Sequence, residues 1–88
     1  MKTFLLTISS PDGNLFRGEV TRLSVRGTEG ELAVMAGHIP FITAVKAGIC
    51  RIETSDKVIK NGEIDGGLLT VSAEQTTLLC GKLTWKQP

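Results

Sequence analysis

The sequence lacks both a long apolar run and an excess of charge of one sign. No stretch of about 18 apolar residues occurs, and residues 1–13 hold just a short apolar stretch broken by threonine, so neither a membrane-spanning helix nor a signal peptide is expected. Ten Lys and Arg against nine Asp and Glu leave a net charge of +1, and the basic residues are scattered along the chain. A surface for nucleic acid or for direct membrane insertion is therefore not predicted.

Histidine and cysteine are also scarce, with His38, Cys50 and Cys80 as the whole set. Three ligands at these spacings do not match a structural zinc site, and a lone histidine without a visible nucleophile does not indicate hydrolytic chemistry. Each cysteine sits in an alternating apolar segment, where a free thiol packs as a small hydrophobe. We expect buried, reduced thiols in a cytoplasmic protein, with no catalytic residue, no cofactor and no metal.

What the sequence does have is apolar residues at every second position. Phe4, Leu6 and Ile8 alternate with polar or outward residues, as on a strand with one buried face. No segment keeps a helical period, and turn signals recur every eight to twelve residues or so, which is typical of a sandwich or a barrel. The 88 residues suffice for one domain with one core.

The turn signals set the expected strands apart. A turn is expected at residues 11–14, where Pro, Asp, Gly and Asn follow one another, and a second at residues 27–30. Either Ser55-Asp56 or Asn61-Gly62 supplies a later turn. Strands are expected at residues 4–8, 15–17, 21–25, 32–34, 41–45, 49–54, 68–72 and 76–80.

Three pairs of adjacent apolar residues place apolar groups on both faces of a strand: Ile49-Cys50, Leu68-Leu69 and Leu78-Leu79. Cys50, Leu69 and Leu79 are the expected core members. Ile49, Leu68 and Leu78 then point outward from the same sheet, and such a patch suggests a surface for a partner. A different strand register, or a C-terminal tail with Trp85 folded over these residues, remains an alternative.

Residues 27–41, GTEGELAVMAGHIPF, combine three glycines with two carboxylates and the histidine. The glycines do not match a P-loop, because the required lysine and the following helix are missing. Glu29 and Glu31 would share one face of a strand, although a turn flanked by glycines does not assure that geometry. Both solvated turn charges and a recognition edge for arginine fit this pattern.

Three segments resemble the epsilon subunit of the F-type ATP synthase, the counterpart of the mitochondrial delta subunit: SPDGNLFRGEV (10–20), RGTEGELAVMAGHIPFITAVKAG (26–48) and GGLLTV (66–71). The resemblance runs from about residue 4 to residue 80. It implies an all-β fold, a β-sandwich of about ten short, mostly antiparallel strands. This N-terminal domain would span residues 1–81, with residues 82–88 as a short tail. The C-terminal helical pair typical of the family, and its inhibitory and ATP-binding activities, are not expected.

The resemblance also implies a function, that of a non-catalytic rotor subunit in the central stalk. Such a subunit links gamma to the c ring and couples ion translocation to ATP synthesis or hydrolysis, as a peripheral component at the cytoplasmic side of the membrane. The implied partners are therefore the gamma subunit and the c ring, and the isolated chain is expected to be a monomer. The alternative is an independent small β-sandwich that binds a peptide or carbohydrate.

The family's contact positions can be carried over to this sequence. The positions that correspond to the c-ring contact are Glu29, Gly30, Glu31 and His38. Those that correspond to the apolar gamma contact are Ile42, Ile49, Ile64, Leu68 and Leu78. Three of this second set are the residues that strand alternation places outward.

Overall fold

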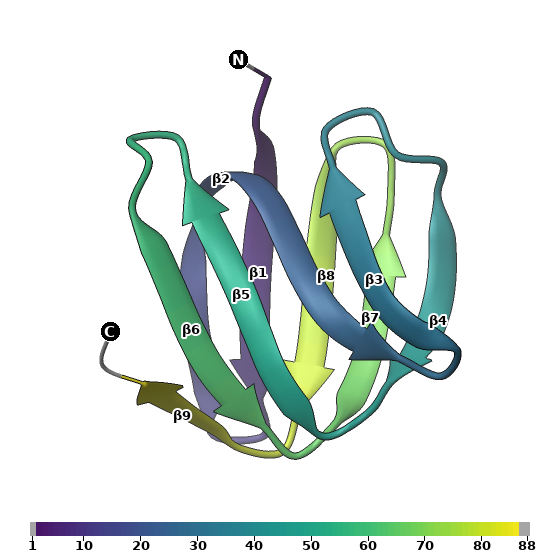
Figure 1. Ribbon diagram of the computed structural model, residues 1–88, viewed down its shortest axis with the longest axis vertical. Coiled ribbons are helices and arrows are strands. Elements are labelled where there is room, and N and C mark those ends of the chain that lie inside the picture. The colour runs from purple at the N-terminus through teal and green to yellow at the C-terminus, as the bar shows by residue number, and fades with distance from the viewer. Residues whose placement is uncertain (1, 87–88) are drawn as a thin grey trace.

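The computed structural model describes residues 2–86, which contain nine β-strands joined by turns and loops (Figure 1). Their bounds are β1 Phe4–Ser10, β2 Gly13–Gly27, β3 Gly30–Met35, β4 Phe41–Val45, β5 Gly48–Thr54, β6 Ile59–Ile64, β7 Gly67–Val71, β8 Gln75–Cys80 and β9 Leu83–Lys86. Within these residues no helix of the length and apolar character needed to span a membrane is found.

The strands pack as two layers (Figure 1). One layer consists of β3, the second half of β2, β5, β6 and β9, and the other of the first half of β2, β1, β8, β7 and β4. Every pairing is antiparallel except that of β1 with β8, among the strands of residues 2–86. The prediction of an all-β sandwich with mostly antiparallel strands is confirmed.

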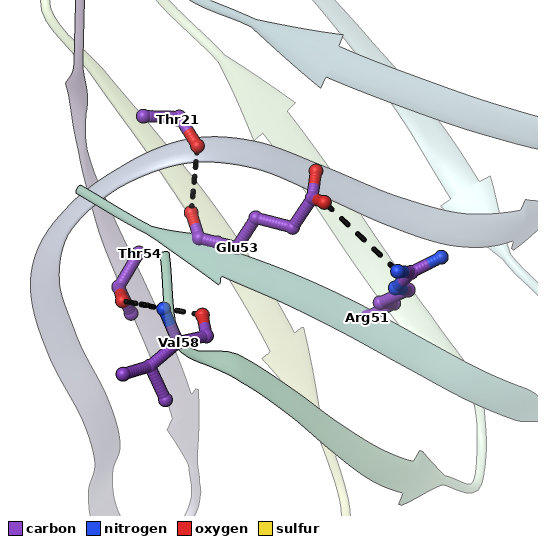
Figure 2. Close-up of polar contacts among 5 residues, drawn as sticks. All are labelled: Thr21, Arg51, Glu53, Thr54 and Val58. Carbon is purple, nitrogen blue, oxygen red and sulfur yellow. Dashed lines mark hydrogen bonds and ion pairs between the residues drawn. The ribbon is translucent and has the colours of Figure 1, made fainter. Parts of the chain in front are cut away.

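Strand β2 belongs to both layers because it bends at a β-bulge between Val20 and Arg22. Val20 is buried before the bulge and Leu23 after it, so the inward side chains shift from even to odd positions. The Thr21 hydroxyl at the bulge donates a hydrogen bond to the Glu53 carbonyl oxygen at 3.1 Å (Figure 2). One extra residue thus turns the strand from one layer into the other without losing its buried face.

The β5–β6 turn follows directly, and its polar groups are bonded locally. The Val58 amide donates to the Thr54 hydroxyl oxygen at 3.2 Å (Figure 2). The same hydroxyl donates to the Asp56 carboxylate, and this hydrogen bond lowers the pKa of Asp56. Of the two turns considered for this region the structure has the first, whereas Asn61 and Gly62 lie within β6.

The core lies between the layers, and every strand from β1 to β8 contributes fully buried side chains, while β9 packs the partly buried Leu83 against it. Its buried members are Phe4, Leu6, Ile8, Val20, Leu23, Val25, Val34, Val45, Cys50, Ile52, Ile64, Leu69, Val71, Leu78 and Cys80. Both cysteines are buried free thiols, as predicted. Burial is the first cause that raises the pKa of each thiol, so both stay protonated near neutral pH.

The turns at residues 11–14 and 27–30 are confirmed, but the strands at residues 15–17 and 21–25 form a single strand of 15 residues, β2. Strand β9 lies in the segment expected to be a tail, so the sheet continues to Lys86. Its Trp85 ring lies 6.1 Å from the Phe16 ring, and the Lys60 ammonium is 5.6 Å from the centre of the Trp85 ring. An ion pair of 2.8 Å joins Lys86 to Glu63 and lowers the pKa of Glu63.

Two of the residues expected on the surface are buried. Leu78 is 0 % exposed while Leu79 is 47 % exposed, so the prediction that Leu79 is the core member of this pair is wrong. The inward positions of β8 are Thr76, Leu78 and Cys80. Ile64 is 3 % exposed and also belongs to the core. Neither Leu78 nor Ile64 is therefore available for the gamma contact that the resemblance implied.

The leucine pair in β8 offers a matched test of this orientation. Leu78→Ala should lower the free energy of unfolding by about 2 to 5 kcal/mol, because it leaves a cavity in a packed core. Leu79→Ala should lower it by less than about 1 kcal/mol, since the side chain lies at the surface. Urea denaturation of both variants measures the difference. Equal losses, or a larger loss for Leu79→Ala, would contradict the strand orientation described here.

Candidate functional site

The two carboxylates of the glycine-rich segment lie at one end of the sandwich, in the hairpin that joins β2 to β3. Gly27 pairs with Gly30 across this hairpin, and Glu31 stands opposite Arg26. Gly30 has a φ of 124°, a backbone conformation that other residues rarely adopt. Glu29 and Glu31 are both exposed, so the fold presents Glu29, Gly30 and Glu31 together. We call residues 27–31 the hairpin end.

His38 lies at the opposite end of β3 and does not join these residues. The four residue steps from Glu31 to Met35 alone span about 13 Å of strand. Beyond Met35 the chain turns, with the His38 amide donating to the Met35 carbonyl oxygen at 3.2 Å. The His38 Nδ1 atom is 2.9 Å from the Ile39 carbonyl oxygen, and its ring lies 4.9 Å from the Phe41 ring. This histidine is held by its own turn and has neither glutamate as a partner.

A hollow of about 350 Å³ opens between β3 and β4 next to the hairpin end. It exists because the two layers meet on this side through a single residue pair, Gly27 with Val45, and then diverge. Residues 27–32 line one wall and residues 41–43 line the other. The hollow has the carboxylates of Glu29 and Glu31 at its rim, and His38 is not among the residues that line it.

The outer face of the layer that holds β4, β7 and β8 carries exposed aliphatic side chains. Ile42 is 67 % exposed and Leu68 is 43 % exposed, in agreement with the outward position expected for Leu68. Leu79 belongs to the same face. Cross-strand pairing places Ala44 opposite Leu68 and Leu68 opposite Leu79. We call Ile42, Ala44, Leu68 and Leu79 the aliphatic face.

The orientation of Leu79 could have been predicted from the sequence, although not from the leucine pair itself. Cys80 was expected to be buried, and residues two apart on a strand share a face. A buried Cys80 therefore requires an inward Leu78 and an outward Leu79. The alternation of a neighbouring residue decides the orientation where two leucines in tandem cannot.

Ile49 is exposed at 48 %, as expected, but it does not lie on the aliphatic face. It belongs to β5, in the other layer, and the outer faces of two packed layers point in opposite directions (Figure 1). The expectation that Ile49 and Leu68 leave the same sheet is therefore wrong. The segment with Trp85 pairs with β6 in the layer of Ile49, so it does not cover Leu68.

The outer face around Ile49 is mostly charged, in contrast to the aliphatic face. Arg51 and Glu53 approach to 3.9 Å on β5, and Glu63 pairs with Lys86 beside them. Such exposed pairs contribute little to stability. They do keep this face well hydrated, so the two outer faces of the sandwich offer different chemistry to a partner.

One carboxylate links the loops at the lower end of the aliphatic face. Asp65 Oδ1 accepts hydrogen bonds from the backbone amides of Gly81, at 3.0 Å, and Lys82, at 3.1 Å. It thereby fixes the β8–β9 turn against the β6–β7 turn. Nearby Cys80 has its pKa raised first by burial and then by the Asp65 charge. Among residues 2–86 no three His, Cys, Asp or Glu side chains lie close enough to hold a metal ion.

The fold and its surfaces define a small β-sandwich with one aliphatic outer face, one charged outer face and a carboxylate-bearing hairpin between them. A family described as the ATP synthase delta/epsilon chain β-sandwich domain matches residues 3–86. The chain belongs to this ATP synthase delta/epsilon family.

Two curated relatives agree with this assignment. The chain is 38 % identical over 86 residues to the sodium ion specific ATP synthase epsilon chain of Acetobacterium woodii, covering 98 % of this chain and 65 % of the relative. It is 37 % identical over 79 residues to the ATP synthase epsilon chain of Bacillus pumilus, covering 90 % of this chain and 60 % of the relative. The chain therefore spans somewhat less than two thirds of the length of these relatives.

Two solved structures share the fold. One is a chain in the mitochondrial ATP synthase of Euglena gracilis, solved with OSCP, F1 and the c ring, with a TM-score of 0.89 and 22 % identity. The match covers 94 % of this chain and 53 % of that one. The other is a chain in the central stalk and c ring of the Tetrahymena thermophila mitochondrial ATP synthase, with a TM-score of 0.80, 15 % identity, and coverage of 93 % and 66 %.

The Asp65 bridge can be tested by two substitutions at one position. Asp65→Ala removes the acceptor of both amides and should lower the free energy of unfolding by about 1 to 2 kcal/mol. Asp65→Asn keeps a side-chain oxygen at the same place, so it should lose less than half as much. Chemical denaturation of both variants measures this. If Asp65→Asn and Asp65→Ala lower the free energy of unfolding equally, the two hydrogen bonds do not stabilise the turn.

Proposed function

We propose that this chain acts as the β-sandwich of a rotor subunit in the central stalk of an F-type ATP synthase. In this role it links the gamma subunit to the c ring and couples ion translocation to ATP synthesis or hydrolysis. It takes no part in the chemistry, and it works as a peripheral component at the cytoplasmic side of the membrane. Family membership over residues 3–86 supports this role.

The observation that carries the proposal is the aliphatic face. Ile42, Leu68 and Leu79 are large, exposed and on one side of a sheet whose other side is the core. Because these side chains are already partly buried, covering the rest of each against a partner contributes roughly half of the 1.5 to 3 kcal/mol expected for full burial. This face is proposed to bind gamma, which revises the contact set implied by the resemblance. Ile42 and Leu68 are kept, Leu79 is added, and Ile49 is left on the opposite face.

The hairpin end is proposed to contact the c ring. Glu29 and Glu31 project from a tight, exposed turn, which suits a paired contact with arginine side chains on a polar loop. Charge pairs at such a contact fix orientation more than they add affinity. Glu29, Gly30 and Glu31 remain in this contact set. His38 does not, because β3 separates it from the hairpin end.

The gamma contact predicts different effects for two similar substitutions. Leu68→Glu should weaken binding to the gamma subunit at least tenfold, because a charge would be buried in an apolar contact. Ile49→Glu, at a similarly exposed site on the other face, should change it by less than about threefold. Titration calorimetry with purified gamma measures both, and circular dichroism checks that each variant is folded. A larger effect of Ile49→Glu would place the gamma contact on the charged face.

The c-ring contact predicts a loss of coupling without a loss of gamma binding. Glu31→Lys should lower ATP-driven ion pumping by a reconstituted complex severalfold, because the new charge repels the arginines of the ring. ATP hydrolysis and gamma affinity should stay near wild type. Glu74→Lys is the matched control, since Glu74 is an exposed carboxylate in the turn between β7 and β8, at the other end of the sandwich. If complexes with Glu31→Lys and with Glu74→Lys pump ions at the same rate, the hairpin end is not the contact with the c ring.

A further inference from the structure

Strand β9 is the one strand, among those of residues 2–86, that has no fully buried side chain. It lies at the edge of its layer and pairs with β6 alone (Figure 1). Leu83 is partly buried, whereas Thr84, Trp85 and Lys86 are exposed. An element that buries so little apolar surface opens at a lower free energy than the body of the domain. Strand β9 is therefore the part of the sandwich that separates from it most readily.

Beneath β9 the fold leaves a slot with Gly62 as its floor. A Cβ atom at Gly62 would lie 2.5 Å from Leu83 Cδ1 and 3.3 Å from Trp85 Cε3, so two side chains of β9 fill the place of a side chain on β6. The Phe16 ring, from the other layer, packs edge-on against Trp85, and the Lys60 ammonium lies 5.8 Å from the centre of the Phe16 ring. We call this space the Gly62 slot. It fits an apolar and an aromatic side chain two positions apart on an extended strand.

The edge of β6 adds a second requirement for whatever occupies the slot. When β9 separates, the backbone groups of β6 that pair with it lose their partners, and such an edge is a template for another strand. On the outer face, Glu63 pairs with Lys86 at 2.8 Å. This exposed ion pair adds little strength, but it favours a lysine at the end of the added strand. The site therefore suits an extended segment with the apolar, aromatic and basic order of β9.

A very short hinge connects β9 to the rest of the sandwich. Gly81 and Lys82 alone join β8, in one layer, to β9, in the other. Both of their backbone amides donate to Asp65, which keeps the connection folded back over its own β6–β7 turn. Short hinges of this kind favour the exchange of an element between two chains. The three residue steps from Cys80 to Leu83 span at most about 10 Å when extended, so two exchanging copies would abut at this end.

We propose that β9 exchanges between two copies of this chain, with Leu83 and Trp85 of each copy seated in the Gly62 slot of the other. A second copy is the occupant because β9 itself is the segment whose fit to the slot the structure displays. The two forms share the same contacts and differ only at the hinge, which makes exchange a low-cost route to a dimer. Strand exchange does not depend on the proposed function. Since β6 and β9 belong to the layer of Ile49, it leaves the aliphatic face uncovered.

Cysteines at facing positions of β6 and β9 report the exchange directly. Glu63 and Thr84 stand opposite each other, so cysteines at these positions are within reach of a disulfide. One full-length chain carries Glu63→Cys, and a second, with a tag that changes its size, carries Thr84→Cys. The two are mixed at a series of protein concentrations, diluted and oxidised with oxidised glutathione. On a denaturing gel without reductant, a disulfide-linked heterodimer should appear and increase with the mixing concentration.

A mixture of Arg51→Cys and Thr84→Cys chains is the matched control. Arg51 is exposed on the same outer face, but it belongs to β5, which β6 separates from β9. The buried thiols of Cys50 and Cys80 are present in every variant and so contribute equally. The Glu63→Cys mixture should give roughly fivefold more heterodimer than this control, or a larger excess. Heterodimer at the control level at every mixing concentration would show that β9 stays on its own chain, and would overturn the proposal.

A locked chain separates strand exchange from association through another surface. Glu63→Cys and Thr84→Cys in one chain, oxidised while dilute, tie β9 to its own β6. Light scattering after size-exclusion chromatography should find dimer at high concentration for the reduced form of this chain and only monomer for the locked form. Circular dichroism establishes that both forms are folded. Equal amounts of dimer in the two forms would mean that the copies associate elsewhere, and strand exchange would be wrong.

Discussion

The bend of β2 at its bulge is the constraint on which the rest of the sandwich depends. Before the bulge the strand pairs with β1, and after it the same strand pairs with β3 and β5. The extra residue moves the buried positions from Val20 to Leu23, which keeps the core side apolar in both layers. Without this shift, one half of a continuous 15-residue strand would present its polar side chains to the core.

The bend also determines how the outer surfaces are arranged. It closes the sandwich where β1 and β2 pair, and leaves the other side joined through Gly27 and Val45 alone. The hairpin end therefore projects freely between an aliphatic face and a charged one. Because strand β2 is shared by both layers, each surface keeps a fixed orientation to the others. The proposed role, in which two partners are held at a fixed angle, needs such a fixed arrangement more than it needs a deep pocket.

Period and turn chemistry predicted the fold class and most strands, because apolar residues at every second position, such as Phe4, Leu6 and Ile8, indicate a strand with one buried face. Two kinds of feature could not be predicted from the same pattern. The tandem leucines at 78 and 79 fit either orientation of the strand. The buried Cys80 decides between them, because it shares a face with Leu78. The layer to which Ile49 belongs depends on which strands pair, and that is fixed by long-range contacts of β2. For the candidate site, exposure was thus predictable for Leu68, but the grouping of residues on one face was not.

The different chemistry of the two proposed contacts fits the mechanical task of a rotor joint. Apolar burial is not directional, so its strength changes little when small rotations shift the facing side chains. Charge pairs depend on distance and geometry, and they are weakened by salt where they are exposed. An aliphatic contact therefore suits the joint that must not slip, on the side of Leu68 and Leu79. The carboxylates of the hairpin end suit the joint whose orientation must be correct, because a misplaced charge there meets repulsion.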